Sequence, residues 1–98
     1  MEHHGNCHVE AVEKVATEHE RSNLIETRLA IWGMGCPNCS MRVRNALLQQ
    51  SGVVDAHVDH QSGAAMVRHN PDMVTLAALL GAGAGAGNGH HQYRAALA

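Results

Sequence analysis

The stretch that decides the fold is Gly33-Met34-Gly35-Cys36-Pro37-Asn38-Cys39, in which two residues separate two cysteines. The residues before it, 27–32, alternate between apolar and polar side chains, as in a half-buried strand. The residues after it, 40–50, have helical spacing and contain neither Pro nor Gly. The sequence therefore predicts that Cys36 lies in a strand-to-helix turn and Cys39 in the first helical turn.

This placement has a direct consequence for the chemistry of the two thiols. A helix start presents unpaired N–H groups and a partial positive charge, and both favour the thiolate form of a nearby cysteine. Two thiolates on a solvent-facing loop suit either a soft metal ion or a dithiol–disulfide couple. From the residues alone, both a metal carrier and a redox site remain open.

Composition narrows the class of protein. A chain of 98 residues predicts one small domain. A net charge of −2 and only two aromatic residues argue against nucleic-acid binding. The first 23 residues lack the apolar core of a secretory signal, and no apolar run approaches the ~20 residues of a membrane span. We therefore expect a cytoplasmic protein without direct membrane insertion, whose start at Met1 favours a free protein.

Two regions differ in character along the chain. Residues 1–23 form an extension with His and Cys residues, in which a narrow apolar stripe predicts a short helix from Val9 to Arg21. Residues 24–98 form the domain. Its predicted elements are a strand over 25–32, a helix over 38–50, strands over 53–59 and 64–69, a helix from residue 76 with Thr75 as N-cap, and a strand over 91–97.

This order is that of an α+β, ferredoxin-like βαββαβ sandwich, with a four-stranded antiparallel sheet under two helices. Alternation places Leu29, Ile31, Ala65 and Val67 in the core, and it places Tyr93, Ala95 and Leu97 together on one face of the last strand. The run of Gly and Ala over 81–89 leaves open whether this part is helix or loop, because each Gly costs about 1 kcal/mol against Ala in a helix.

The motif at residues 33–39, the helix after it, Gly52-Val53-Val54, a hairpin and Asn70-Pro71-Asp72 resemble the heavy-metal-associated domain family. This family includes copper chaperones, metal-binding domains of copper-transporting P-type ATPases and the mercury-binding protein. The resemblance covers about residues 26–97. It implies a non-enzymatic metallochaperone for metal transport and copper homeostasis.

The resemblance also implies roles for individual residues. Cys36 and Cys39 match the two metal-binding thiolates, and Met34 matches a buried Met beneath the loop. Cu(I) is the expected ion, with Ag(I), Hg(II) or Zn(II) as alternatives. The expected partner is a metal-transporting P-type ATPase or its metal-binding domain, and a metal-bridged dimer is a further expectation. Gly35 and Gly83 depart from the family pattern.

Two alternatives remain beside copper transfer. Zinc favours four ligands, and no carboxylate adjoins Cys36, which argues against a zinc site. Cys-Pro-Asn-Cys at a helix start also resembles the motif of glutaredoxins, which are thiol–disulfide oxidoreductases. A glutaredoxin fold, however, needs a further helix where this sequence predicts a hairpin.

Histidines and a third cysteine supply further candidate ligands near the chain ends. The resemblance makes His90, just before the last strand, a candidate third ligand, with His91 as a fallback. In the extension, Cys7 and His8 could reach the thiol site. The N-terminal amine, two backbone nitrogens and His3 would form a planar four-nitrogen site for Cu(II) or Ni(II). Arg28, Arg42 and Arg44 predict a mildly basic face near the thiols.

Overall fold

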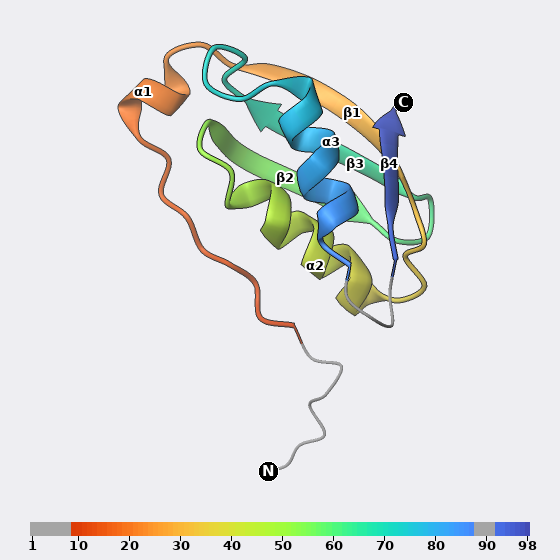
Figure 1. The fold of residues 1–98 in the computed structure, drawn as a ribbon. Coiled ribbons are helices and arrows are strands. Elements are labelled where there is room, and N and C mark those ends of the chain that lie inside the picture. Colours follow the sequence, from red (N-terminus) through yellow and green to blue (C-terminus); the bar gives the residue numbers. More distant parts are fainter. Residues whose placement is uncertain (1–8, 88–91) are drawn as a thin grey trace.

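The computed structural model describes residues 9–87 and 92–98, and its sheet carries two helices on one face (Figure 1). The elements in chain order are α1 (Glu18–Arg21), β1 (Ile25–Trp32), α2 (Pro37–Leu48), β2 (Val53–Asp59), β3 (Ala64–His69), α3 (Leu76–Gly85) and β4 (Arg94–Leu97). The strand order is β2-β3-β1-β4, and all neighbouring strands are antiparallel. The predicted ferredoxin-like sandwich is therefore confirmed.

The core lies between the sheet and the pair α2 and α3. Strand alternation sends Leu29 and Ile31 of β1 inward beside Ala65 and Val67 of β3, all at most 3% exposed. The helices cover them with fully buried aliphatic side chains, namely Val43, Leu47 and Leu79. Apolar side chains at every second strand position thus pack against the apolar faces of the two helices in one aliphatic layer, as the sequence predicts.

Helix α2 begins and ends close to its predicted bounds. It starts at Pro37, whose fixed φ suits the first helical position, and it ends at Leu48, two residues before the predicted end. After it, Gly52 adopts a φ of +97°, and a Cβ there would lie 2.8 Å from the Cβ of Met73. This turn therefore requires glycine, and it leads directly into β2.

The run of glycine and alanine is helical as far as Gly85. The Thr75 side chain caps the helix by accepting a hydrogen bond from the Ala78 amide at 3.1 Å. Gly83 faces the sheet, where an added Cβ would lie 3.3 Å from Cδ1 of Ile31 and 3.5 Å from Cβ of Ala95. Close packing against the sheet thus stabilises a segment whose residues favour helix only weakly.

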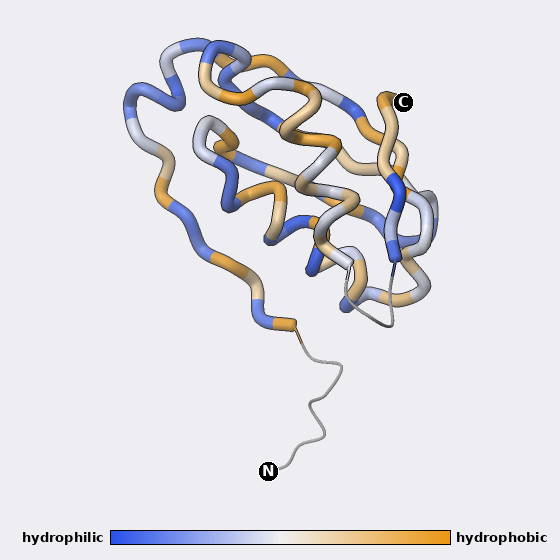
Figure 2. Tube along the Cα trace, viewed as in Figure 1, coloured by the Kyte–Doolittle hydropathy of each residue, from blue (hydrophilic) through white to orange (hydrophobic). Residues whose placement is uncertain are grey.

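The extension differs from its prediction. Only Glu18–Arg21 is helical, and residues 9–16, here called the strap, run extended along α2 (Figure 1). Figure 2 shows hydrophilic and hydrophobic residues alternating along the strap. Val12, Lys14 and Ala16 are partly buried, whereas Val15 is 89% exposed. The predicted apolar stripe of Val9, Val12, Val15 and Ala16 does not form, because polar side chains of the domain bind the strap backbone instead.

The last strand is shorter than the predicted 91–97 within the described residues. Tyr93 precedes it and is buried, and Ala95 is partly buried against the core, as expected. Leu97, however, is 51% exposed, because β4 is an edge strand that the fold covers on one side only. Within residues 9–87 and 92–98, no helix has the length and apolar character needed to cross a membrane.

Candidate metal centre

The loop between β1 and α2 is held against the chain that enters β4. Gly33 has a φ of +100°, and a Cβ there would collide with the carbonyl of Gln92. The next residue, Met34, is 9% exposed and packs in the core beneath the loop. Gly33, which lets the loop approach the carbonyl of Gln92, and the buried Met34 therefore fix the loop before Cys36.

Cys36 is the N-cap of α2. Its carbonyl accepts hydrogen bonds from the amides of Cys39 at 3.0 Å and Ser40 at 3.4 Å. Its side chain makes no capping hydrogen bond, and the first turn contains no acidic residue. The thiol of Cys36 therefore stays available, and no nearby carboxylate of the helix neutralises the positive end of the helix dipole.

The two thiols meet at this helix end. The Sγ atoms of Cys36 and Cys39 lie 3.5 Å apart, well beyond a disulfide bond length of ~2.05 Å, so no disulfide joins them. Cys39 is 1% exposed, whereas Cys36 is half-buried. The site therefore has a buried, fixed sulfur and a more accessible one.

Tyr93, the residue before β4, contacts the buried sulfur of Cys39. Burial opposes ionisation of the Cys39 thiol, but hydrogen bonds from Tyr93, the Gly35 backbone and Cys36 outweigh it and lower the pKa of Cys39. Burial, followed by the hydrogen bond to Cys39, raises the pKa of Tyr93. The arrangement thus stabilises a thiolate at Cys39 with a hydroxyl that itself stays protonated.

The sequence pattern placed Tyr93 on one face of the last strand with Ala95 and Leu97, and it did not reveal the contact with Cys39. The signal lies in the topology: β1 and β4 are antiparallel, with Trp32 opposite Arg94. The end of β1 and the start of β4 therefore lie side by side. Once the βαββαβ order is assumed, the residue before β4 must adjoin the loop that follows β1.

Comparison with known proteins agrees with this geometry. The model of the heavy-metal-associated domain matches residues 28–87, more than half of the chain. The chain belongs to the heavy-metal-associated domain family. No curated protein sequence matches it.

Solved structures share the fold of this heavy-metal-associated domain. A copper-binding domain from HMA7, a P-type ATPase, is 26% identical, with a TM-score of 0.68 over 74% of this chain and 92% of that one. The CopZ metallochaperone is 25% identical, with a TM-score of 0.65 over 74% of this chain and 100% of that one. Oxidized MerP from Ralstonia metallidurans CH34, at 24% identity, matches with a TM-score of 0.67 over 76% of this chain and 96% of that one.

The fold also bears on the glutaredoxin alternative. In this heavy-metal-associated domain the β2–β3 hairpin follows α2 directly, and the whole sheet is antiparallel. The Cys-Pro-Asn-Cys motif therefore lies on a ferredoxin-like sandwich and not on a glutaredoxin fold.

The predicted basic face separates into three environments. The Arg44 guanidinium donates to the Val12 carbonyl at 3.1 Å and so binds the strap. Arg28 lies on the sheet, whereas Arg42 lies one helical turn after Cys39. Only Arg42 of the three therefore stands beside the thiols.

His57 of β2 and His69 of β3 lie apart from the thiol pair in the described part of the chain. His57 is exposed on β2, with its Nε2 3.1 Å from Oδ2 of Asp55. His69 is buried at the far end of β3, with Nε2 2.7 Å from the Thr27 hydroxyl, and burial lowers its pKa. Within the described ranges, no group of three or more His, Cys, Asp or Glu side chains could hold a metal ion.

Several predicted ligands lie outside the described residues. These are His3, Cys7 and His8 in the extension, and His90 with its fallback His91 before β4. The described part of the candidate centre therefore consists of Cys36, Cys39 and their supporting residues.

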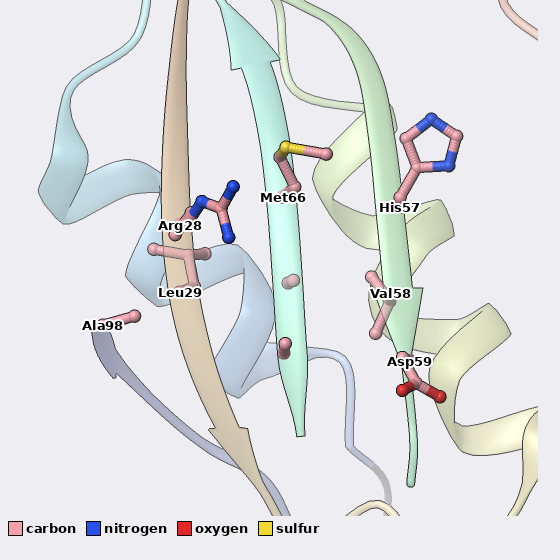
Figure 3. A pocket seen from close by; sticks show the side chains of 9 residues that line it. Arg28, Leu29, His57, Val58, Asp59, Met66 and Ala98 are labelled. Atoms are coloured by element: carbon pink, nitrogen blue, oxygen red, sulfur yellow. The ribbon is translucent and has the colours of Figure 1, made fainter. Parts of the chain in front are cut away.

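A hollow of about 420 Å³ lies elsewhere, on the sheet (Figure 3). Arg28, His57 and Met66 stand around it, and small side chains such as Ala64 and Ala98 leave the space open. No cysteine lines this hollow. The hollow is therefore not the candidate metal centre.

Proposed function

We propose that this domain binds one Cu(I) ion between Cys36 and Cys39 and transfers it to a partner protein, without catalysing a chemical reaction. The observation that carries the proposal is the meeting of two thiols, 3.5 Å apart and not joined by a disulfide, at a helix N-terminus. Cu(I) is a soft ion that thiolates bind preferentially. Family membership and the likeness to the copper-binding domain of HMA7 support the same ion, and the likeness to the CopZ metallochaperone supports transfer of a metal.

The geometry favours an ion of low coordination number. With metal–sulfur bonds of about 2.3 Å, a linear two-thiolate complex places its sulfurs about 4.6 Å apart, so the thiols must separate by roughly 1 Å. Cys36 lies outside the helical turns and can make this movement, whereas Cys39 is fixed in the core. Zinc prefers four ligands, and the described residues bring only these two sulfurs together.

Unequal exposure of the two sulfurs suggests how the ion leaves. A partner thiolate approaches on the accessible side, where Cys36 lies, and forms a three-coordinate complex with both cysteines. The bond to Cys36 then breaks first, and the bond to the buried Cys39 breaks last. The copper ion keeps its charge throughout, and each departing thiolate is replaced by one from the partner. Such an exchange suits a cytoplasmic chaperone that delivers to a metal-transporting P-type ATPase or its metal-binding domain.

Residues at the two ends supply the proposed third ligands. His90 lies two residues before Gln92, whose carbonyl adjoins Gly33 of the metal loop. Cys7 lies three residues before Glu10, whose carbonyl accepts a hydrogen bond from Asn45 of α2. Three residues span up to ~10 Å, and the six helical positions from Asn45 back to Cys39 rise about 9 Å. Cys7 and His8 are therefore within reach of the thiol pair, and His3 remains the proposed Cu(II) ligand of the terminus.

Anaerobic Cu(I) titration with mass spectrometry of the intact complex tests the proposal. We expect one Cu(I) per chain in competition with a chromophoric chelator, and loss of tight binding when Cys36 and Cys39 are both replaced by Ser. His57→Ala, at an exposed position of β2 apart from the thiols, is the control and should keep the stoichiometry of one. Unchanged affinity in the Cys36→Ser/Cys39→Ser variant would refute the proposed function.

A further inference from the structure

Arg42 is a cationic side chain beside the thiol pair that lacks a counter-ion among the described residues. It lies three positions after Cys39, so the two side chains share one side of α2. Its Nε atom is buried and has no hydrogen-bond partner in the described part of the chain. By contrast, Arg68 pairs with Glu26 at 3.5 Å, and Lys14 pairs with Glu20 at 3.0 Å.

The charge of Arg42 acts on the same group that contacts the buried thiol. Burial and the hydrogen bond to Cys39 raise the pKa of Tyr93, and negative charge on Cys39 and Cys36 adds to this, whereas Arg42 acts in the opposite direction. Arg42, both cysteines and Tyr93 thus belong to one electrostatic cluster. Arg44, two positions further, donates to the Val12 carbonyl and to Asn45, and so takes no part in this cluster.

Different ions give this cluster different charges. Two thiolates that bind Cu(I) or Ag(I) form a complex with one net negative charge. The same thiolates with Hg(II) or Zn(II) form a neutral complex. The metal-free site is the same for both kinds of ion, so the protonation of its thiols cancels from the comparison. The two complexes therefore differ by one unit of charge. A fixed cation nearby therefore stabilises the monovalent complex relative to the divalent one.

We propose that Arg42 is a specificity-determining residue, whose positive charge makes the Cys36–Cys39 site favour monovalent over divalent soft ions. The inference rests on the proposed function, because it assumes that both thiolates hold the ion. For a unit charge about 7 Å from a metal complex and an effective dielectric of about 20 to 40, Coulomb's law gives a change in affinity of roughly ten- to fiftyfold. The chain thus uses a helix side chain to select its ion by charge, in addition to the softness of its sulfurs.

Replacing Arg42 by Met tests the inference, because Met keeps much of the length and packing of the side chain and removes its charge. We expect the ratio of Cu(I) affinity to Hg(II) affinity to fall about tenfold. Cu(I) is measured against a chromophoric chelator, and Hg(II) is measured against a small competing dithiol. Arg42→Lys, which keeps the charge, should restore most of the ratio.

Arg68→Met is the matched control, since it removes the same charge from β3, near the start of β1 and so at the end of that strand away from the metal loop. It should leave the ratio unchanged. A folding defect would lower both affinities together, so the ratio isolates the charge. If Arg42→Met keeps the wild-type ratio, or Arg68→Met lowers it equally, the inference is wrong. If the parent chain itself fails to bind Cu(I) through Cys36 and Cys39, the proposed function fails instead.

Discussion

At the level of single residues, Glu20 is a buried carboxylate with three partners among the described residues. Its Oε1 accepts from the Thr17 amide at 2.9 Å, and its Oε2 accepts from the Gly52 amide at 2.6 Å and lies 3.0 Å from Nζ of Lys14. The hydrogen bonds from the Thr17 and Gly52 backbones, aided by Lys14, lower the pKa of Glu20 to about 2 despite its burial. One side chain thus joins the α1 cap, the strap and the turn after α2.

This network predicts how stability depends on pH. The folded pKa of about 2 lies below the ordinary value of 4.5, so the unfolded chain binds the proton more tightly. The stabilisation is complete above pH 4.5 and is lost as the pH falls toward 2. The shift corresponds to roughly 3 kcal/mol. We expect Glu20→Gln to lower the free energy of unfolding at pH 7 and to flatten its decline between pH 5 and 3.

Urea unfolding at several pH values measures both effects. Glu18→Gln is the control, because it removes the same charge from an exposed position in the same short helix. It should leave the slope between pH 5 and 3 nearly unchanged. Equal slopes for Glu20→Gln and the parent chain would show that the network contributes nothing to stability.

At the scale of elements, α3 shows tertiary packing overriding a weak local preference. Leu79 is fully buried, and Gly83 lets the helix approach Ile31 and Ala95 of the sheet. Gly81 and Gly85, in contrast, have open space where a Cβ would lie. Only Gly83 of the three therefore has a packing reason to be glycine.

Gly81→Ala should consequently stabilise the domain. Alanine favours a helix interior over glycine by about 0.5–1 kcal/mol, which raises the melting temperature by roughly 2–8 °C in a domain of this size. Gly83→Ala should gain less, because its methyl group would lie 3.3 Å from Cδ1 of Ile31. Thermal unfolding followed by circular dichroism checks this order. A melting temperature that Gly81→Ala leaves unchanged, or a larger gain from Gly83→Ala, would contradict it.

At the scale of the whole molecule, the strap is fixed to the domain through backbone recognition. The Val12 amide donates to Oδ1 of Asn45 at 2.9 Å, and the Asn45 amide group donates to the Glu10 carbonyl at 2.7 Å. The Lys14 ammonium donates to the carbonyls of Gln50 and Val53. The strap therefore runs along α2, and toward its N-terminal end it approaches the helix turns that lead back to the thiols (Figure 1).

Asn45→Ala should release this part of the strap. The variant loses both hydrogen bonds, at a cost of about 1–2 kcal/mol, and hydrogen exchange at the Val12 amide should accelerate by roughly tenfold. Gln49→Ala, at an exposed position near the end of α2, is the control and should leave that exchange rate unaltered. Persistent protection of Val12 in Asn45→Ala would show that other contacts hold the strap.

The local elements and the position of the thiol motif could be predicted from the residues alone. The strands over 25–32, 53–59 and 64–69 and the Thr75 cap could be predicted because alternation and capping act between near neighbours. The placement of Cys36 and Cys39 at a strand-to-helix turn followed from the same local rules.

Features that depend on contacts between distant parts of the chain could not be predicted in this way. Residues 9–21 have helical periodicity, but hydrogen bonds with Asn45, and from Lys14 to Gln50 and Val53, hold residues 9–16 extended. Gly83 is helical because Ile31 lies against it, and Tyr93 meets Cys39 because β4 pairs with β1. Sequence periodicity reports which face of an element is apolar, whereas these contacts are set by which elements the fold brings together.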